Sequence, residues 1–200
     1  MTPAAATDDA LIEELYRSEG KAEIRNGMLV REEATGDAPS RAGGFIFVSL
    51  LLHERTAGGG IAYPDNIGYL VNLPNLRSFS PDASFFTGQR AGMRFLDGAP
   101  VFAAEVRSES DYGPAAEQAM EEKRRDYFAA GTLVVWDVDL LGPDTVRKFA
   151  APDAATAAAI FRRGRRDLPP RRSGRRRTDR PRLGDAGGRP VPLNTRQKTT

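Results

Sequence analysis

The stretch Pro100-Val101-Phe102-Ala103-Ala104-Glu105-Val106 decides how the rest of this chain is arranged. A short apolar run of this kind is typical of a strand in a core sheet, and a carboxylate stands near its end, where the pattern favours an apolar residue. Alternation along a strand puts Val101, Ala103 and Glu105 on one face of the sheet. Because a buried carboxylate without a partner is costly, we expect a cation or a proton to compensate Glu105.

A second short strand precedes this stretch, and a helix follows it. Ser80-Pro81-Asp82-Ala83-Ser84-Phe85-Phe86 predicts a strand with Asp82 at its start, although Ser-Pro-Asp is also an ordinary turn sequence. Residues 115–130 predict a helix, preceded by a proline that suits its first turn. The helix follows the Glu105 strand after a short loop, so we expect it to pack across that strand.

The predicted helix carries a lysine on its apolar side. Ala116, Met120, Lys123 and Tyr127 recur at intervals of four, three and four residues, which places them on one stripe. We expect this stripe to face the sheet, so that the Lys123 ammonium reaches toward Glu105. A purely structural ion pair between Glu105 and Lys123 explains the same pattern, because lysines commonly extend from apolar stripes. The pattern alone leaves both interpretations open.

The remaining elements give a mixed pattern of helices and strands. Residues 22–30 predict a hairpin, because the pair Asn26-Gly27 suits a tight turn in which both residues adopt positive φ. Glu23 lies on its first strand, where a solvated surface charge is the ordinary interpretation. The other expected elements are helices at 7–19 and 43–54, loops at 31–41 and 87–98, and strands at 61–63, 68–73, 132–139 and 145–149.

Composition limits the class of protein. Two hundred residues, 40% of them hydrophobic, are enough for one domain with a substantial core. The chain has no cysteine and a single histidine, His53, which excludes disulfides, thiolate metal sites and sites with several histidine ligands. No apolar run approaches the roughly 18 residues of a membrane span, and the N-terminus lacks a signal-peptide pattern. We therefore expect a cytoplasmic protein without membrane partners.

The net charge of +2 hides two segments of opposite charge. Residues 162–200 contain 13 Arg and one Lys against three Asp, a net charge of +11, whereas residues 1–161 carry a net charge of −9. We predict a folded domain over 1–161 and a disordered Arg/Pro-rich tail over 162–200, because apolar residues are almost absent from the tail. Such a tail is either a basic arm that binds nucleic acid or the product of a frame shift in the coding sequence.

Five stretches in this order resemble the PD-(D/E)xK nuclease superfamily, and more closely its Uma-two family, which is assigned to the restriction endonucleases. They are Ala22-Glu23-Ile24-Arg25-Asn26-Gly27-Met28-Leu29-Val30, Phe79-Ser80-Pro81-Asp82-Ala83-Ser84-Phe85, Ala104-Glu105-Val106-Arg107-Ser108-Glu109-Ser110-Asp111, Glu122-Lys123-Arg124-Arg125-Asp126-Tyr127-Phe128-Ala129-Ala130-Gly131 and Leu133-Val134-Val135-Trp136-Asp137-Val138-Asp139. The resemblance covers roughly residues 8–160. It implies a restriction-endonuclease-like α/β fold, in which helices flank a mixed central β-sheet.

The resemblance also implies catalytic and metal-binding roles. Asp82 matches the PD aspartate and Glu105 the acid that follows it, so both would bind a divalent cation. Lys123 matches the family's lysine, displaced here from the strand onto the helix. Glu23 is a candidate third acid for the metal.

Arg107 and Tyr127 are candidates for supporting roles. Arg107 stands two positions after Glu105, where the superfamily usually has lysine. An arginine is suited to contacting a phosphate, but it does not accept a proton at neutral pH. Tyr127 follows Lys123 by one helical turn.

The implied activity is metal-dependent hydrolysis of phosphodiester bonds in DNA. Carboxylate oxygens suit Mg²⁺ or Mn²⁺, and a bound cation offsets the negative charge with which the domain would meet a polyanion. The alternatives are an inactive relative that binds nucleic acid or protein, and a small globular domain whose ion pairs are structural. DNA is the expected partner, and a homodimer is compatible with the sequence.

Overall fold

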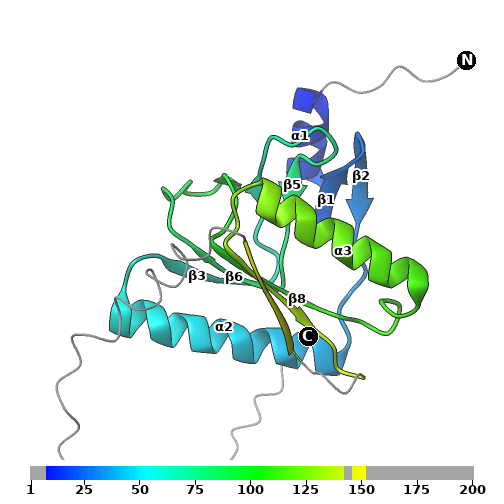
Figure 1. Cartoon of the computed structure of the whole chain (residues 1–200). Coiled ribbons are helices and arrows are strands. Elements are labelled where there is room, and N and C mark those ends of the chain that lie inside the picture. Colours follow the sequence, from blue (N-terminus) through cyan, green and yellow to red (C-terminus); the bar gives the residue numbers. More distant parts are fainter. Residues whose placement is uncertain (1–7, 142–145, 152–200) are drawn as a thin grey trace, which may run out of the picture. The chain divides into compact units, whose positions relative to one another are not determined.

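The computed structural model describes residues 8–141 and 146–151, which form a mixed α/β fold (Figure 1). In chain order the elements are α1 (Asp8–Arg17), β1 (Ala22–Arg25), β2 (Met28–Arg31), α2 (Asp37–Ala57), β3 (Ile61–Pro64), β4 (Tyr69–Leu70), β5 (Ser78–Phe79), β6 (Ala83–Phe86), β7 (Leu96–Asp97), β8 (Phe102–Val106), α3 (Pro114–Ala129), β9 (Val134–Val138) and β10 (Val146–Ala150). The predicted mixed sheet flanked by helices is confirmed. The predicted tail, 162–200, lies outside the described residues, and none of the described helices is long and apolar enough to cross a membrane.

The central sheet holds five strands in the order β10-β9-β8-β6-β3. β8 and β9 run parallel, and every other neighbouring pair in this sheet is antiparallel. A parallel pair needs a crossover connection, which α3 supplies between β8 and β9. The strand that carries Glu105 is therefore the middle strand of the sheet, and the helix that carries Lys123 follows it directly.

Apolar residues of α2 cover one face of the sheet. Leu50 of α2 packs with Phe85, Phe102 and Ala104, which β6 and β8 direct to this face. Val101 was expected on the face of Glu105, but it packs here instead. The reason is that β8 begins only at Phe102, so the regular alternation does not extend back to Val101.

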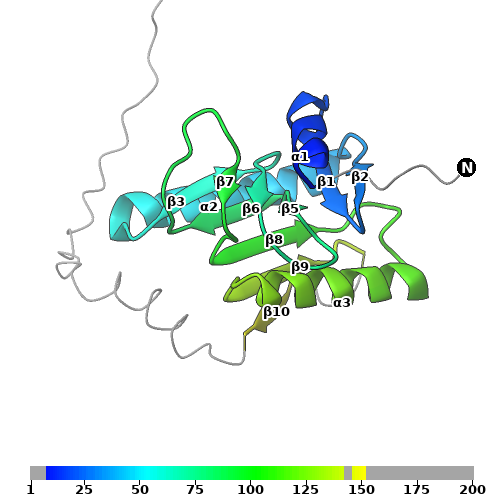
Figure 2. The same cartoon turned by 90° about the horizontal axis from the view of Figure 1, so that it is seen from above.

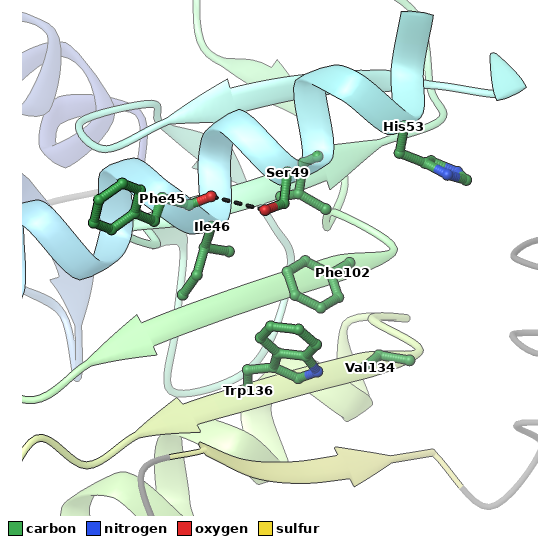
Figure 3. Close-up of a pocket in the computed structure, with 8 residues that line it drawn as sticks. Phe45, Ile46, Ser49, His53, Phe102, Val134 and Trp136 are labelled. Carbon is green, nitrogen blue, oxygen red and sulfur yellow. Dashed lines mark hydrogen bonds between the residues drawn. The ribbon is translucent and has the colours of Figure 1, made fainter. Parts of the chain in front are cut away.

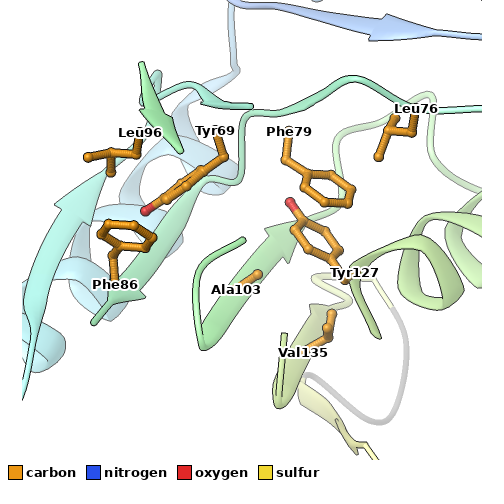
Figure 4. Packing of buried hydrophobic residues seen from close by; sticks show 8 residues of the cluster. All are labelled: Tyr69, Leu76, Phe79, Phe86, Leu96, Ala103, Tyr127 and Val135. Carbon is orange, nitrogen blue, oxygen red and sulfur yellow. The ribbon is translucent and has the colours of Figure 1, made fainter. Parts of the chain in front are cut away.

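The opposite face of the sheet is covered by α3 (Figures 1 and 2). Tyr127 of α3 is fully buried in one cluster with Ala103 of β8 and Val135 of β9 (Figure 4). Its ring stacks on Phe79 with the two ring centroids 4.1 Å apart. The alternation predicted for the Glu105 strand therefore holds along β8, and α3 anchors on the face that also carries Glu105.

The predicted hairpin is present, but Glu23 on its first strand is buried and not at the surface as expected. Asn26 and Gly27 have φ of 50° and 69°, as the tight turn requires. α1 lies against this hairpin (Figure 2), and its Leu11 and Leu15 pack in one cluster with Ala22 and Ile24 of β1. The surface interpretation of Glu23 is wrong, because its side chain is buried and accepts a hydrogen bond from a buried backbone N–H.

Several predicted ranges also differ; the strand expected at 68–73, for example, is reduced to β4. The expected loop at 31–41 is wrong in its second half, because α2 begins at Asp37 and takes Pro39 into its first turn. Proline is tolerated there since that N–H has no partner within the helix. The expected loop at 87–98 contains the short strand β7, which pairs in parallel with β4.

We expect Asp137→Ala to lower the free energy of unfolding by roughly 3–5 kcal/mol, because it leaves the buried guanidinium of Arg107 without its main partner. Arg107 Nε and Nη2 donate to the two carboxylate oxygens of Asp137 at 2.7 and 2.8 Å, and both side chains are fully buried. Urea unfolding followed by circular dichroism measures the change. Glu121→Ala is the control, since it removes only an exposed pair with Arg125 and is expected to have little effect. Equal losses in the two variants would contradict the prediction.

Candidate active site

Glu105 near the end of β8 receives hydrogen bonds from two side chains of α3. Lys123 Nζ donates to Glu105 Oε2 at 2.7 Å, and the Tyr127 hydroxyl donates to Glu105 Oε1 at 2.5 Å. Glu105 and Tyr127 are buried, and the Lys123 side chain is only 10% exposed. Lys123 and Tyr127 of the predicted stripe therefore do face the sheet, whereas its first two members, Ala116 and Met120, are half-buried and line a cleft.

Asp82 lies beside Glu105 because β6 and β8 are neighbours in the sheet. It directly precedes β6, and its Oδ2 accepts the backbone N–H of Val106 at 2.7 Å. Its Oδ1 accepts a hydrogen bond from Lys21 Nζ at 2.6 Å. The side chain is 14% exposed, so Asp82 stands between the interior and the solvent.

Glu23 joins the same group from β1. Its Oε1 accepts the backbone N–H of Ser80 at 2.8 Å and lies 3.4 Å from Lys123 Nζ. Its Oε2 forms an ion pair with Arg25. Lys123 thus lies between the carboxylates of Glu105 and Glu23, and the structure brings Asp82, Glu105, Glu23, Lys123 and Tyr127 together.

The electrostatic environment changes the protonation of this group. Burial raises the pKa of Glu105 to about 7, with a further contribution from the nearby charge of Asp82, while Lys123 acts in the opposite direction. Burial acts to lower the pKa of Lys123, but the carboxylates of Glu105 and Glu23 outweigh it and the pKa is raised. Burial also raises the pKa of Tyr127 well above its ordinary value. At neutral pH Lys123 is therefore a cation, Tyr127 a neutral donor, and Glu105 divided between its two protonation states.

These acids open onto a cleft of about 890 Å³. Its lining includes Asp82, Glu105 and Lys123, together with the basic Arg25 and the acidic Glu32. The cleft thus presents carboxylates and cations to the same space, which suits a polyanionic ligand bound together with a metal ion.

The carboxylates fit a divalent cation by their chemistry. Among residues 8–141 and 146–151, no group of three or more His, Cys, Asp or Glu side chains is arranged to hold a metal ion. Mg²⁺, however, is typically bound through one or two carboxylates together with water and substrate phosphate. Asp82 and Glu105 supply two such carboxylates, and a cation near them would offset both the burial of Glu105, which chiefly raises its pKa, and the smaller contribution from the charge of Asp82. Glu23, the predicted third ligand, is engaged by Arg25 and Lys123.

Arg107 lies next to this group, but its donors are engaged within the fold. Its guanidinium binds Asp137 through two hydrogen bonds and also donates to both carboxylate oxygens of Glu117. The side chain is fully buried. This arrangement fits a residue that ties β8 to β9 and α3 rather than one that contacts a phosphate.

Two basic residues of the site were not singled out from the sequence. Lys21 lies between α1 and β1, where no periodic pattern gives it a direction, and Arg25 ends β1. Only the position of Arg25 on the predicted hairpin, two residues from Glu23, offered a signal. Lys21 is recognisable only once Asp82, 61 residues away, is brought against it.

A second pocket, of about 470 Å³, lies on the α2 side of the sheet (Figure 3). Phe45 and Ile46 of α2 line it together with Phe102 of β8 and Trp136 of β9, and His53 of α2 stands at its edge. The sheet separates this pocket from Glu105. Its lining is almost wholly apolar and offers no pair of carboxylates, so the acidic cleft is the candidate active site.

Comparison with known proteins gives a family and a fold for this chain. A model of the Uma2 family, described as "Putative restriction endonuclease", matches residues 9–181. Among solved structures, the chain is similar to "a putative nuclease belonging to DUF820" from Anabaena variabilis, with 14% sequence identity and a TM-score of 0.53. That similarity covers 76% of this chain and 98% of the other, and it supports the restriction-endonuclease-like fold. No curated protein matches this chain.

We expect Glu105 to make the stability of the metal-free protein depend on pH. The pKa of Glu105 in the folded protein, about 7, lies above its ordinary value of 4.5, so the folded state binds more protons between these values. Its stabilising contribution is therefore complete below pH 4.5 and is lost as the pH rises through about 7. Relative to Glu105→Gln, the wild type should lose up to roughly 3 kcal/mol across this window.

Urea unfolding in EDTA at a series of pH values measures this difference. Glu122→Gln, at an exposed position of α3, is the matched control and should follow the wild type. A constant difference between wild type and Glu105→Gln at all pH values would contradict the prediction.

Proposed function

Because the chain belongs to the Uma2 family, whose description is "Putative restriction endonuclease", we propose that it is a metal-dependent endonuclease that hydrolyses phosphodiester bonds in DNA. One observation carries the proposal: Glu105 of β8, Lys123 of α3 and Asp82, just before β6, all line one cleft. Lys123 Nζ is 2.7 Å from Glu105, and Asp82 is joined to the same strand through the N–H of Val106. Sequence spacing alone does not require this convergence.

Asp82 and Glu105 would hold the divalent cation. Bound there, Mg²⁺ or Mn²⁺ would supply positive charge for the scissile phosphate and a lowered pKa for water. The protein's part is to keep both carboxylates directed toward the cleft. Val106 N–H orients Asp82, and the hydroxyl of Tyr127 orients Glu105.

Lys123 would act on the reacting phosphate. In the hydrolysis, water forms a new P–O bond and releases a proton, the bond to the leaving oxygen breaks, and the leaving oxygen takes up a proton. An ammonium beside the phosphate stabilises the negative charge that develops in this step. Glu23, 3.4 Å from Lys123 Nζ, would keep the ammonium charged and in place.

DNA as the substrate is part of the same proposal. Residues 1–161 carry a net charge of −9, so their overall field does not attract DNA. Local charge is different, because Arg25 and Lys123 line the cleft beside the acids. A metal ion at the carboxylates would further increase the positive potential where the backbone phosphates are to bind. A cytoplasmic location belongs to the proposal as well, and the absence of cysteine suits it.

An inactive relative that binds nucleic acid or protein is the second candidate. It is favoured by Arg107, which stands two positions after Glu105 and is fully engaged by Asp137 and Glu117. If Lys123 does not perform the role of the lysine that is usual at the position of Arg107, the protein would bind nucleic acid or protein without cleaving DNA. Cleavage and binding assays on the same variants separate the two candidates.

We expect the purified protein to nick supercoiled plasmid DNA in the presence of Mg²⁺ or Mn²⁺ and to lose this activity in EDTA. Asp82→Asn, Glu105→Gln and Lys123→Met should each lower the cleavage rate by at least about a hundred-fold, because each removes a group that acts on the transition state. Agarose gel electrophoresis of the plasmid forms measures the rate.

Lys148→Met is the matched control for Lys123→Met. Lys148 is exposed on β10, with its ammonium 4.8 Å from the centroid of the Trp136 ring. The substitution therefore removes the same charge as Lys123→Met, but at a position away from the cleft. DNA binding without cleavage by the wild type would favour the inactive relative. Cleavage that survives in Asp82→Asn and Glu105→Gln would overturn the assignment of the site.

A further inference from the structure

The ammonium of Lys21 is surrounded by three carboxylates at the edge of the site. Lys21 Nζ lies 2.6 Å from Asp82 Oδ1, 3.0 Å from Asp65 Oδ1 and 3.1 Å from Glu32 Oε2. Only 9% of the side chain is exposed. One cation thus occupies a position bounded by oxygen atoms, which is the kind of environment that a metal ion also takes.

The backbone holds Lys21 at this place. Gly20 before it has a φ of 81°, and the chain turns there from α1 into β1. The carbonyl of Lys21 accepts the backbone N–H of Glu32, so Lys21 and Glu32 close the open end of the hairpin. The ammonium therefore reaches Asp82 from a fixed part of the fold and not from a loose surface side chain.

Lys21 is charged at neutral pH. Burial acts to lower its pKa, but Asp82, Glu105 and Glu32 outweigh this effect, and the pKa is raised. Both carboxylate oxygens of Asp82 accept hydrogen bonds: Oδ1 from the Lys21 ammonium, and Oδ2 from the backbone N–H of Val106. Two cations at one carboxylate repel each other strongly where water is scarce.

We propose that Lys21 is a positioning residue that serves as the internal counter-ion of Asp82 and competes with the divalent cation for it. In the metal-free protein the ammonium neutralises Asp82 and keeps it directed toward Glu105. When the cation binds, the contact between Lys21 and Asp82 weakens, and Lys21 retains Asp65 and Glu32 as partners. Lys21 thus sets how tightly the site holds its metal. The inference rests on the proposed function, because it takes Asp82 as a metal ligand.

A structural clamp is the competing explanation. Lys21 links the hairpin to the turn that holds Asp65 and to the start of β6, so its loss would lower stability whatever the site does. A purely structural role of Lys21 predicts no change in metal affinity between the wild type and variants that are equally well folded. Metal binding is therefore the readout that separates the two roles.

The test measures the affinity of the full-length protein for Mn²⁺, without DNA, by isothermal titration calorimetry. Lys21→Met keeps the length of the side chain and removes its charge, and it should bind Mn²⁺ about ten-fold more tightly, because a charged hydrogen-bond partner of Asp82 no longer competes. Lys21→Arg keeps the charge and should remain close to the wild type. Lys148→Met is the control for a lysine removed away from the cleft, and its affinity should not change.

Thermal unfolding with and without Mn²⁺ adds a second readout. Lys21→Met should have a lower melting temperature than the wild type in EDTA, and Mn²⁺ should raise it by more than it raises that of the wild type. If Lys21→Met does not fold, Lys21→Gln makes the same measurement with a neutral donor in place. Unchanged or weaker Mn²⁺ affinity in the neutral variants overturns the role of Lys21 and leaves the proposed function standing. If neither the wild type nor the variants bind Mn²⁺, the proposed metal dependence is overturned, and so is the role of Lys21.

Discussion

A carboxylate held inside a β-sheet is the constraint on which the site depends. Glu105 lies on the middle strand, among small apolar side chains, where an ionised group without partners is strongly disfavoured. The fold compensates it from α3, through the ammonium of Lys123 and the hydroxyl of Tyr127. The same helix provides the crossover that makes β8 and β9 parallel, so the topology of the sheet and the compensation of Glu105 have one structural origin.

Two groups of charged residues share this face of the sheet and differ in how fully their charges are compensated. Arg107 and Asp137 are fully buried and joined by two hydrogen bonds, which link the end of β8 to β9. The group around Glu105 has a surplus of carboxylates and borders the cleft, because Glu32 and Asp65 also share the ammonium of Lys21. Its five acids are Glu105, Glu23, Asp82, Glu32 and Asp65, and its three cations are Lys123, Arg25 and Lys21. Closed ion pairs stabilise a structure, whereas incompletely neutralised acids at a cleft are typical of a site that receives a cation.

Much of this arrangement could be predicted from the residues around Glu105. The interval pattern from Ala116 to Tyr127 placed Lys123 toward the sheet, and the pair Asn26-Gly27 predicted the hairpin turn. Local patterns failed where a contact joins distant segments. Glu23 looked like a surface charge because its strand is short, and the residues that bury it, near Ser80, lie more than 50 positions away. The start of α2 was missed because proline in a first turn resembles a loop in sequence.

The sequence by itself determined which residues share a face of a strand or helix, since side-chain direction follows from the local periods of the backbone. It thereby determined that Glu105 is inward and that Lys123 lies on the same side as Tyr127. Only the tertiary structure decided which charges neutralise which, as with Lys21 on Asp82 and Arg107 on Asp137. The strength of an ion pair depends on the distance between its groups and on the water around them, and both are set when segments from different parts of the chain pack together.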